Sequence, residues 1–422
     1  MKSFKTNMIQ HILHIFIRRT HFWRTVSVSE MAELYTSRVL RVMAMNMLGG
    51  FGAVYFYQLG YSLQFLAWFY VFLFGTRFLS IPLVVVIVAR YGPKHSISIS
   101  NLLFILAVLV LAATPILGIW TFLLMLPFGG FGRGLYDTAY LVDFSKVKHI
   151  EHSGKEIGLM QIIERFMTAA APVMGGFIAL LFGPSAMMIF AGVLMLVSAS
   201  PLFFTSEPVK IHQKITLRHF NFKNTWKLMV AQIGVGADNN GSGLIWNIFV
   251  ALVVLGAVNN AVYLKIGILS SVSLVASIAI SYIYGKIVDK NSGIFLLKLS
   301  SIGNFLLYVF RPLISTPLQV ASMNIANEFA TTGYNIPATR GIFNTADGLP
   351  GYRVVFIAVM VSMLAVGDVL ASLVLVVLTT IFSDVDALKN YYLVLAPLML
   401  LILFHSSAIY RRGILTRFIH HV

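Results

Sequence analysis

The sequence predicts an all-α integral membrane protein with twelve transmembrane helices. Of its 422 residues, 58% are hydrophobic and only 11% are charged, and the mean hydropathy is +0.84. A chain this apolar has too few charged residues to cover the surface of a soluble domain. Its apolar residues also fall into twelve windows, each about as long as the roughly twenty residues that a helix needs to cross the hydrocarbon core.

The windows follow one another along the chain and are separated by polar connections. They span residues 36–58, 63–88, 97–116, 119–142, 157–181, 185–204, 227–255, 263–285, 294–314, 318–339, 354–382 and 389–410. Residues 1–35 are expected to form a cytoplasmic or interfacial segment, because the apolar run Ile9–Ile17 is too short and interrupted for a cleavable signal. Residues 411–422 are expected to form a cytoplasmic tail.

Lysine and arginine predict the orientation of these helices. They gather in the connections on one side of the membrane, whereas the other side has little beyond Lys265 and Lys389. The positive-inside rule therefore puts both termini in the cytoplasm, as expected for a multi-pass protein of the cell (cytoplasmic) membrane. The longest polar connection, residues 205–225, lies on the same side and separates six helices (36–204) from six others (226–410).

Composition also excludes several classes of function. The formal net charge of +16 lies in short basic clusters between apolar runs, where it sets topology against an anionic membrane face, so nucleic-acid binding is not expected. The chain has no cysteine, which excludes thiolate metal sites and cysteine nucleophiles. No pair of histidines has metal-ligand spacing inside a span. We therefore expect no metal, no cofactor and no enzymatic activity.

Two turns that lie two hundred positions apart follow the second helix of each half. The later turn, Gly285–Lys290, reads G-x-x-x-D-K, and the earlier turn, Val85–Lys94, has Ala89 at the position of Asp289. Together with the six plus six helices and the basic central linker, this motif resembles the major facilitator superfamily over essentially the whole chain. The resemblance implies two pseudo-symmetric six-helix bundles that move by alternating access. Pro172–Gly176 is similar to the end of a pattern found in exporters of this family.

The resemblance also implies a cytoplasmic gate. In the family, the basic residue of this turn meets an acid at the end of helix four, which indicates Arg90 with Asp143. In the second half the acid lies in the turn and the base at the end of helix ten, which indicates Asp289 with Arg340. We expect such pairs to hold the cytoplasmic side closed and to break when it opens. The gate candidates are Arg90, Asp143, Glu164, Arg165, Asp289 and Arg340.

Charged side chains inside the spans are candidates for function, because each costs roughly 2.5–3.5 kcal/mol to insert. Arg133 and Asp137 lie four residues apart near the middle of helix four, on one face, and Arg77 lies near the middle of helix two. Two interpretations remain open. Arg133 and Asp137 form an intrahelical salt bridge with Arg77 as a packing group, or the arginines present a positive centre to an anionic substrate or to a proton-accepting Asp137. Asp368 in helix eleven either pairs with a base or titrates.

Other polar positions favour a structural role or leave the choice open. Arg38 and Arg41 lie close to the cytoplasmic end of helix one, where snorkelling favours a structural role. Helix seven holds four glycines in ten residues around Asp238 and Asn239, at roughly 1 kcal/mol each, and is expected to be kinked or locally unwound. Such a broken helix lines the midplane site of some transporters. The alternative is a close helix crossing.

Helix ten carries a polar stripe of helical period. Its members are Asn324, Asn327, Glu328, Thr331, Thr332 and Asn335. A stripe facing lipid is untenable, so it contacts protein or water. It forms either interhelical packing contacts or a wall of a transport cavity in which Glu328 is a substrate or proton site.

The sequence thus predicts a secondary active transporter that moves a small solute as a monomer. Buried carboxylic acids hold a proton more readily than acids in water, so we expect proton coupling through Asp137, Glu328 and Asp368. The arginines of the first half favour an organic anion, whereas the Phe and Met content favours an amphipathic drug or lipid, including as an exported substrate. A non-transporting sensor or scaffold with this fold is the other alternative. The candidate substrate-binding residues are Arg77, Arg133, Asp238, Asn239, Asn324, Glu328 and Thr331.

Overall fold

The computed structural model describes residues 28–48, 51–147, 153–200, 215, 220, 222–256, 260–271, 273–291, 293–349 and 351–407. Within these ranges all regular secondary structure is helical. Five helices are long and apolar enough to cross a membrane, and a sixth span results if α4 (Leu63–Leu79) and α5 (Ile81–Tyr91), which are bent by 45°, are taken together. Each of the twelve predicted windows overlaps one described helix or several consecutive shorter ones.

The first half contains the helices up to α11. Besides α4 and α5 they are α2 (Val28–Leu48), α3 (Phe51–Gln58), α6 (Pro93–Ala112), α7 (Thr114–Leu117), α8 (Trp120–Met125), the π-helix η2 (Leu126–Phe131), α9 (Gly132–Val147), α10 (Ser153–Phe182) and α11 (Pro184–Ala199). The turn before α6 uses Gly92 at a φ of 83°, a conformation that glycine adopts freely. Pro93 then takes the first helical position, where its fixed φ and missing N–H are favourable.

The second half contains the helices from α12 onwards. They are α12 (Phe222–Asn239), the π-helix η4 (Asn240–Ile245), α13 (Trp246–Phe249), the π-helix η5 (Val250–Val254), α14 (Ala261–Ser271), α15 (Leu274–Asn291), α16 (Ile294–Phe310), the 3-10 helix η6 (Arg311–Leu313), α17 (Pro317–Asp347), α18 (Arg353–Ile381), α19 (Asp384–Met399) and the 3-10 helix η7 (Leu400–His405). The turn before α16 again has a glycine at positive φ, Gly293 at 71°. Both related turns therefore contain a glycine at positive φ, although the ψ angles differ, 161° at Gly92 and 11° at Gly293.

Helix seven contains two π-helical stretches, each of which follows an α-helical one. Its polar stretch Asn240–Ile245 and the later stretch Val250–Val254 both form π-helices, in which backbone hydrogen bonds run from i to i+5 and the helix is wider than an α-helix. Helix four has a similar stretch, Leu126–Phe131, which contains Pro127 and two glycines. Residues that destabilise an α-helix thus coincide with both midspan π-helices.

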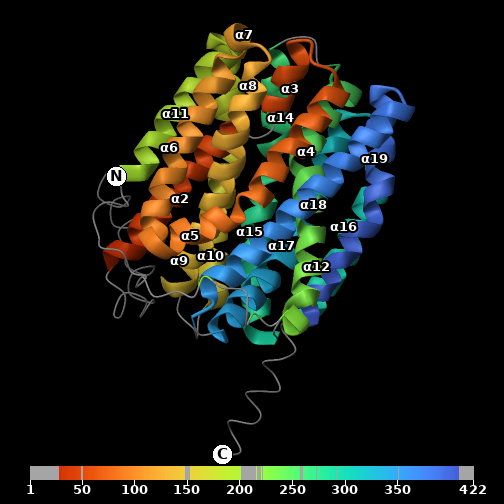
Figure 1. Ribbon diagram of the computed structural model, residues 1–422. Helices are drawn as coiled ribbons and strands as arrows, with labels where there is room; N and C mark the ends of the chain where they lie inside the picture. The colour runs from red at the N-terminus through yellow and green to blue at the C-terminus, as the bar shows by residue number, and fades with distance from the viewer. Residues whose placement is uncertain are drawn as a thin grey trace, which may run out of the picture.

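The helices form two bundles that lie side by side (Figure 1). In the first bundle, α2 packs against α10 and α11, and α6 packs against α9 and α11. In the second bundle, α12 packs against α18, and α17 packs against α15 and α16. The bundles meet along two lines, where α4 contacts α18 and α10 contacts α14 and α15.

Two glycines bring the bundles close together where α10 crosses α14. A Cβ atom at Gly267 would lie 2.5 Å from the carbonyl oxygen of Pro172, and one at Gly176 would lie 2.7 Å from the carbonyl oxygen of Tyr263. Small residues permit such an approach of two backbones inside a membrane. Gly176 ends the segment that resembles an exporter pattern, and the structure gives this segment a packing function.

Polar and aromatic contacts also join the bundles at both ends. Near the end of α3, the Tyr263 hydroxyl donates to Gln58 Oε1 at 2.6 Å. At the opposite end, Arg353 Nη1 donates to the carbonyl and to the hydroxyl oxygen of Ser145, each at 2.9 Å. Phe144 packs there against Phe343, with ring centroids 5.4 Å apart. Between these two ends lie the charged residues Arg133, Asp137, Glu328 and Asp368, which were predicted to carry function.

Candidate substrate site between the two bundles

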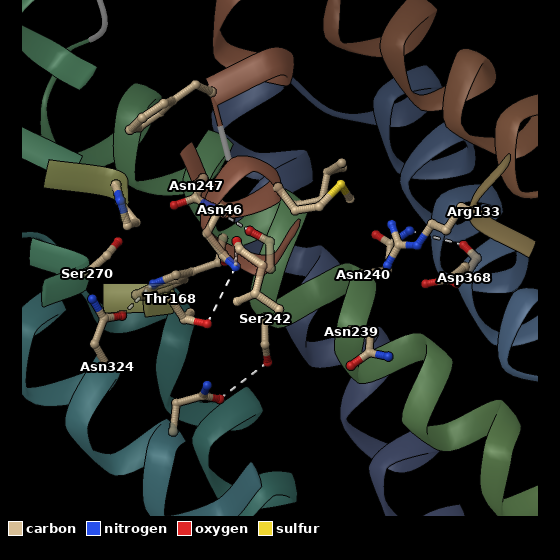
Figure 2. A pocket seen from close by; sticks show the side chains of 18 of the residues that line it. Asn46, Arg133, Thr168, Asn239, Asn240, Ser242, Asn247, Ser270, Asn324 and Asp368 are labelled. Atoms are coloured by element: carbon tan, nitrogen blue, oxygen red, sulfur yellow. Dashed lines mark hydrogen bonds between the residues drawn. The ribbon is translucent and has the colours of Figure 1, made fainter. Parts of the chain in front are cut away.

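A cavity of about 470 Å³ lies between the two bundles. Its walls come from α2, α3, α4, α9 and α10 of the first bundle and from α12, η4, α13, α14, α17 and α18 of the second. This volume lies in the range of roughly 300–1,000 Å³ that is typical of small-molecule sites. Figure 2 shows polar side chains converging on it from helices of both bundles. The cavity therefore has the location and size expected of a central transport site.

Three arginines, Arg38, Arg41 and Arg133, line the cavity from the first bundle. The Arg133 side chain is 42% exposed. The Arg41 guanidinium stacks on the Tyr136 ring, 3.5 Å from its centroid, and donates to Asn101 Oδ1. Arg41 is only 2% exposed, so the prediction that it snorkels to the interface is wrong.

Arg38 also lines the cavity but is held by an acid. Its Nε lies 2.7 Å from Glu164 Oε1 and its Nη2 lies 3.2 Å from Glu164 Oε2. Such a two-point pair fixes the guanidinium plane. Glu164, predicted as part of the cytoplasmic gate, thus joins α10 to α2 within the first bundle.

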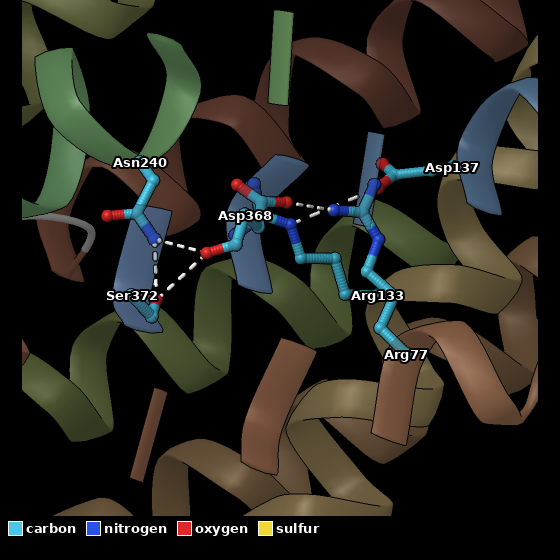
Figure 3. Close-up of polar contacts among 6 residues, drawn as sticks. All are labelled: Arg77, Arg133, Asp137, Asn240, Asp368 and Ser372. Atoms are coloured by element: carbon cyan, nitrogen blue, oxygen red, sulfur yellow. Dashed lines mark hydrogen bonds and ion pairs between the residues drawn. The ribbon is translucent and has the colours of Figure 1, made fainter. Parts of the chain in front are cut away.

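Arg77 joins the two bundles at the level of the cavity (Figure 3). Its Nη2 lies 2.7 Å from Asp137 Oδ2, and its Nη1 lies 2.8 Å from Asp368 Oδ2 in the second bundle. The side chains of Arg77 and Asp368 are each 2% exposed, whereas Asp137 is 29% exposed. Arg133 is more distant, with its Nε 3.9 Å from Asp137 Oδ2. Asp368 therefore pairs with a base, and Arg77 forms ion pairs within its own bundle and across the bundle interface, rather than serving only as a packing group.

Hydrogen bonds from η4 hold the helix turn that carries Asp368. Asn240 Nδ2 donates to the Asp368 carbonyl oxygen at 3.1 Å and to Ser372 Oγ at 2.9 Å. The Tyr391 hydroxyl donates to Asn240 Oδ1 at 3.0 Å. Figure 3 shows the contacts of Asn240 with Asp368 and Ser372 beside the Arg77 ion pairs. The position of Asp368 is thus fixed from its own bundle.

Asp238 is buried behind the cavity wall. It is 1% exposed and accepts hydrogen bonds from three hydroxyl groups. Tyr308 donates to Oδ1 at 2.9 Å, Ser242 donates to Oδ1 at 2.6 Å, and Tyr334 donates to Oδ2. Asp238 therefore acts on the wall through Ser242, which lines the cavity.

Arg311 is a buried residue that the sequence reasoning missed. It is 1% exposed, and its Nη2 donates to Ser242 Oγ and to Asn327 Oδ1, each at 2.8 Å. Its guanidinium carbon lies 4.4 to 5.1 Å from the ring centroids of Tyr308, Tyr392 and Trp246, within cation–π range. Arg311 falls near the end of a predicted window, where an arginine can reach the membrane interface at little energetic cost, so its position did not indicate burial. The signal that could have found it is an arginine on the side that is poor in basic residues.

Arg311→Leu is expected to destabilise the protein by about 1.5–3 kcal/mol, because it removes charge-assisted hydrogen bonds to Ser242 and Asn327 and a buried positive charge that Ser242 links to Asp238. Thermal unfolding in detergent measures this effect. The double variant Arg311→Leu with Asp238→Asn is expected to recover part of the loss, since it removes both charges. Two single effects that simply add in the double variant would contradict this account.

Comparison with known proteins identifies the family. The family model described as Major Facilitator Superfamily matches residues 34–372. The chain belongs to the Major Facilitator Superfamily. A sequence search of curated proteins finds no match.

Solved structures of this superfamily have the same fold. The human organic anion transporter MFSD10 (TETRAN) matches with a TM-score of 0.67 and 12% identity, over 90% of this chain and 99% of that one. The nucleoside transporter NupG matches with a TM-score of 0.61 and 13% identity, over 91% and 99%. The E. coli fucose:proton symporter FucP matches with a TM-score of 0.60 and 14% identity, over 89% and 97%. Members of the superfamily are multi-pass membrane transporters and not enzymes.

The superfamily fold brings most of the predicted site residues to one cavity. Arg77 and Asp238 lie directly behind the wall, each bonded to residues that line it. The Thr331 hydroxyl donates to the Asn327 carbonyl oxygen at 2.9 Å within α17. Asn324 of the polar stripe lines the cavity and also donates from Nδ2 to the Leu269 carbonyl oxygen of α14 at 2.9 Å, so the stripe contributes both to the cavity wall and to contacts between helices. The predicted residues that line the cavity are Arg133, Asp137, Asn239, Asn324, Glu328 and Asp368.

The gate residues that the superfamily resemblance implies are described only in part. The Arg90 side chain is exposed at the end of α5, and Asp143 is fully buried in α9. Arg340 Nη1 donates to the carbonyl oxygen of Val288, the residue before Asp289. Both gate pairs stay predictions. The side chains of Asp289 and Arg165 lie outside the described residues.

Proposed function

We propose that the chain is a proton-coupled secondary active transporter that moves a small organic anion by alternating access at the cavity between its bundles. The observation that carries this proposal is the ion pair between Arg77 and Asp368, which crosses the bundle interface beside the cavity. The bundles of such a transporter rock against each other around a central site. An ion pair across their interface must therefore change during the transport cycle.

A proton on Asp368 would release this pair at little cost. Removing one partner of a buried ion pair costs about 3–5 kcal/mol when the other charge is left uncompensated. The Arg77 charge would stay compensated, because Asp137 of the same bundle remains 2.7 Å from its Nη2. Protonation of Asp368 thus removes an attraction between the bundles and leaves the Arg77 charge compensated inside the first bundle.

Arg133 is the favoured anion-binding group. It is the most exposed residue of the ion-pair network, and its 3.9 Å contact with Asp137 is the longest of the three pairs there. Two arginines and two aspartates balance in this network. A bound monoanion adds one negative charge, and a proton on Asp368 restores neutrality. We therefore propose one proton per monoanion, carried in the same direction.

We also propose that both termini are cytoplasmic, in a monomer of the cell membrane. On this orientation the contact of Arg353 with Ser145 lies at the cytoplasmic end, where Arg353 also pairs with Asp347 of its own bundle at 2.6 Å. This contact would break when the cytoplasmic end opens. The predicted pairs of Arg90 with Asp143 and of Arg340 with Asp289 are proposed to act in the same gate.

Transport into proteoliposomes tests the proposal. Uptake of a labelled organic anion is expected to increase when the outside is made acidic relative to the inside. It is expected to be insensitive to membrane potential clamped with potassium and valinomycin, because one proton and one monoanion carry no net charge. Uptake that does not change with the pH gradient would contradict proton coupling. Transport of uncharged or cationic solutes alone would contradict the assignment of an anionic substrate.

A further inference from the structure

We propose that the transported anion is a polyhydroxylated one, an anionic sugar with a carboxylate or phosphate group, and not an amphipathic anion. This inference rests on the proposed function and names the substrate class of the same cavity. It is carried by the contrast between two walls. The first bundle presents three arginines among mainly apolar side chains, and the second presents five asparagines and three serines beside two carboxylates, Glu328 and Asp368.

The wall from the second bundle is unusually rich in asparagine. A primary amide presents two N–H donors and a carbonyl acceptor side by side, which complements a hydroxyl group that both donates and accepts. Ser270 and Ser273 add hydroxyl groups from the end of α14 and the turn after it. The asparagines that line the cavity from this bundle are Asn239, Asn240, Asn247, Asn324 and Asn327.

Two of these amides are already used by the protein. Asn240 holds the turn that carries Asp368, as described above. Asn324 Oδ1 accepts from Trp246 Nε1 at 2.7 Å, and its Nδ2 donates to the Leu269 carbonyl oxygen at 2.9 Å. These contacts fix the wall and leave little for a ligand.

The other three amides keep groups for a ligand. Asn239 is exposed, and among the described residues it has no hydrogen-bond partner (Figure 2). Asn327 accepts from Arg311 through Oδ1, so its Nδ2 remains as a donor. Asn247 donates from Nδ2 to the Gly243 carbonyl oxygen at 2.6 Å, so its Oδ1 remains as an acceptor. The available groups thus include both donors and acceptors, as vicinal hydroxyl groups require.

An amphipathic anion fits this wall poorly. The apolar part of such an anion would cover hydrogen-bond donors and acceptors of the wall and displace their water without replacing its hydrogen bonds. Each wall group left without a hydrogen bond weakens binding by roughly five- to a hundredfold. Sites built to hydrogen-bond a substrate hydroxyl discriminate against analogues without it by roughly 10⁴-fold or more. A polyhydroxylated anion satisfies the amides with its hydroxyl groups while its charge meets Arg133 on the opposite wall. It would therefore contact both bundles at once.

A ligand panel on the purified full-length protein tests this inference by thermal shift and by counterflow in proteoliposomes. The probes are glucuronate, gluconate, glucose 6-phosphate, glucose, succinate and a naphthalenesulfonate. At least one of the first three is expected to stabilise the protein and to exchange, and the last three are expected to bind at least about tenfold more weakly. The carboxylate and phosphate probes distinguish the two kinds of anionic group.

The possible failures are distinguishable. If succinate or the naphthalenesulfonate exchanges as well as every hydroxylated anion, or if no hydroxylated anion binds, the inference is overturned and organic-anion transport can still hold. If glucose alone exchanges, the anion assignment of the proposed function fails instead.

Three variants test the role of each cavity wall in substrate binding. Asn239→Ala is expected to weaken binding of the hydroxylated anion about tenfold and to leave succinate unaffected. Arg133→Gln is expected to abolish the preference for the anionic sugar over glucose. Ser322→Ala, at an exposed position of α17 that does not line the cavity, is expected to change neither. Equal losses for hydroxylated and plain anions in Asn239→Ala would indicate a merely structural asparagine and would overturn the inference.

Discussion

Asp368→Asn is expected to abolish accumulation driven by a pH gradient and to preserve exchange of the substrate across the membrane. One proton per monoanion allows roughly 100-fold accumulation across two pH units, since each unit is worth about 1.4 kcal/mol. The amide cannot carry a proton at this position, so the variant's accumulation ratio is expected to fall to about one. Exchange persists because Arg77 keeps Asp137 as its partner. Measuring uptake with a pH gradient and counterflow without one, in the same proteoliposomes, separates the two activities.

The matched control is Asp386→Asn. Asp386 is an exposed acid in the first turn of α19 and accepts a hydrogen bond from the Ser383 hydroxyl, far from the ion pairs of the cavity. Its replacement is expected to leave accumulation unchanged. An Asp368→Asn transporter that still concentrates its substrate would show that the proton binds elsewhere, and Asp137 or Glu328 would then be tested in the same way.

Gly267→Val is expected to shift the protein away from the conformation described here and to slow transport by about five- to a hundredfold. A Cβ at this position would lie 2.5 Å from the Pro172 carbonyl oxygen and 3.1 Å from the Val173 Cα atom. These are backbone atoms, which cannot turn aside as a side chain can. Overpacking of this kind costs roughly 1–3 kcal/mol. Because α10 and α14 belong to different bundles, separating the bundles relieves the clash without unfolding either one.

Cysteine labelling measures this shift. The chain contains no cysteine, so a single Gln58→Cys reporter near the end of α3 reacts with a membrane-impermeant maleimide without background. Labelling is expected to be faster in the Gly267→Val background. Gly303→Val in α16 is the control, since nothing lies within 4 Å of a Cβ built there. Unchanged labelling in Gly267→Val, or an equal change in Gly303→Val, would contradict the expected separation.

The membrane made much of the fold predictable. A span must satisfy its backbone hydrogen bonds internally, so length and apolarity alone located helices over all twelve windows. The cost of inserting a charged side chain into the membrane likewise made part of the site predictable. Asp137, Asp368 and Glu328 stand out from their spans for this reason, and all three line the cavity.

Pairing between distant residues could not be predicted in this way. Arg77 and Asp368 are 291 residues apart, and nothing local in either helix indicates the other. Asp238 was predicted to bind substrate because it lies among four glycines in a helix expected to be broken, yet three hydroxyl groups from neighbouring segments hold it behind the cavity wall. Arg311 looks like a helix end in the sequence, and only the rings of Trp246, Tyr308 and Tyr392 around it reveal its burial. These features depend on tertiary contacts.

The π-helix η4 determines which amides of helix seven face the cavity. Asn239, Gly243 and Asn247 all line it, at a spacing of four residues. In an α-helix, with about 3.6 residues per turn, each such step drifts by about 40°, so Asn247 would point about 80° away from Asn239. The wider π turn takes up the extra residue and cancels this drift. Deleting one residue from Asn240–Ile245 would therefore rotate Asn247 by about 100° out of the cavity wall, although the amide itself would still be present in the chain.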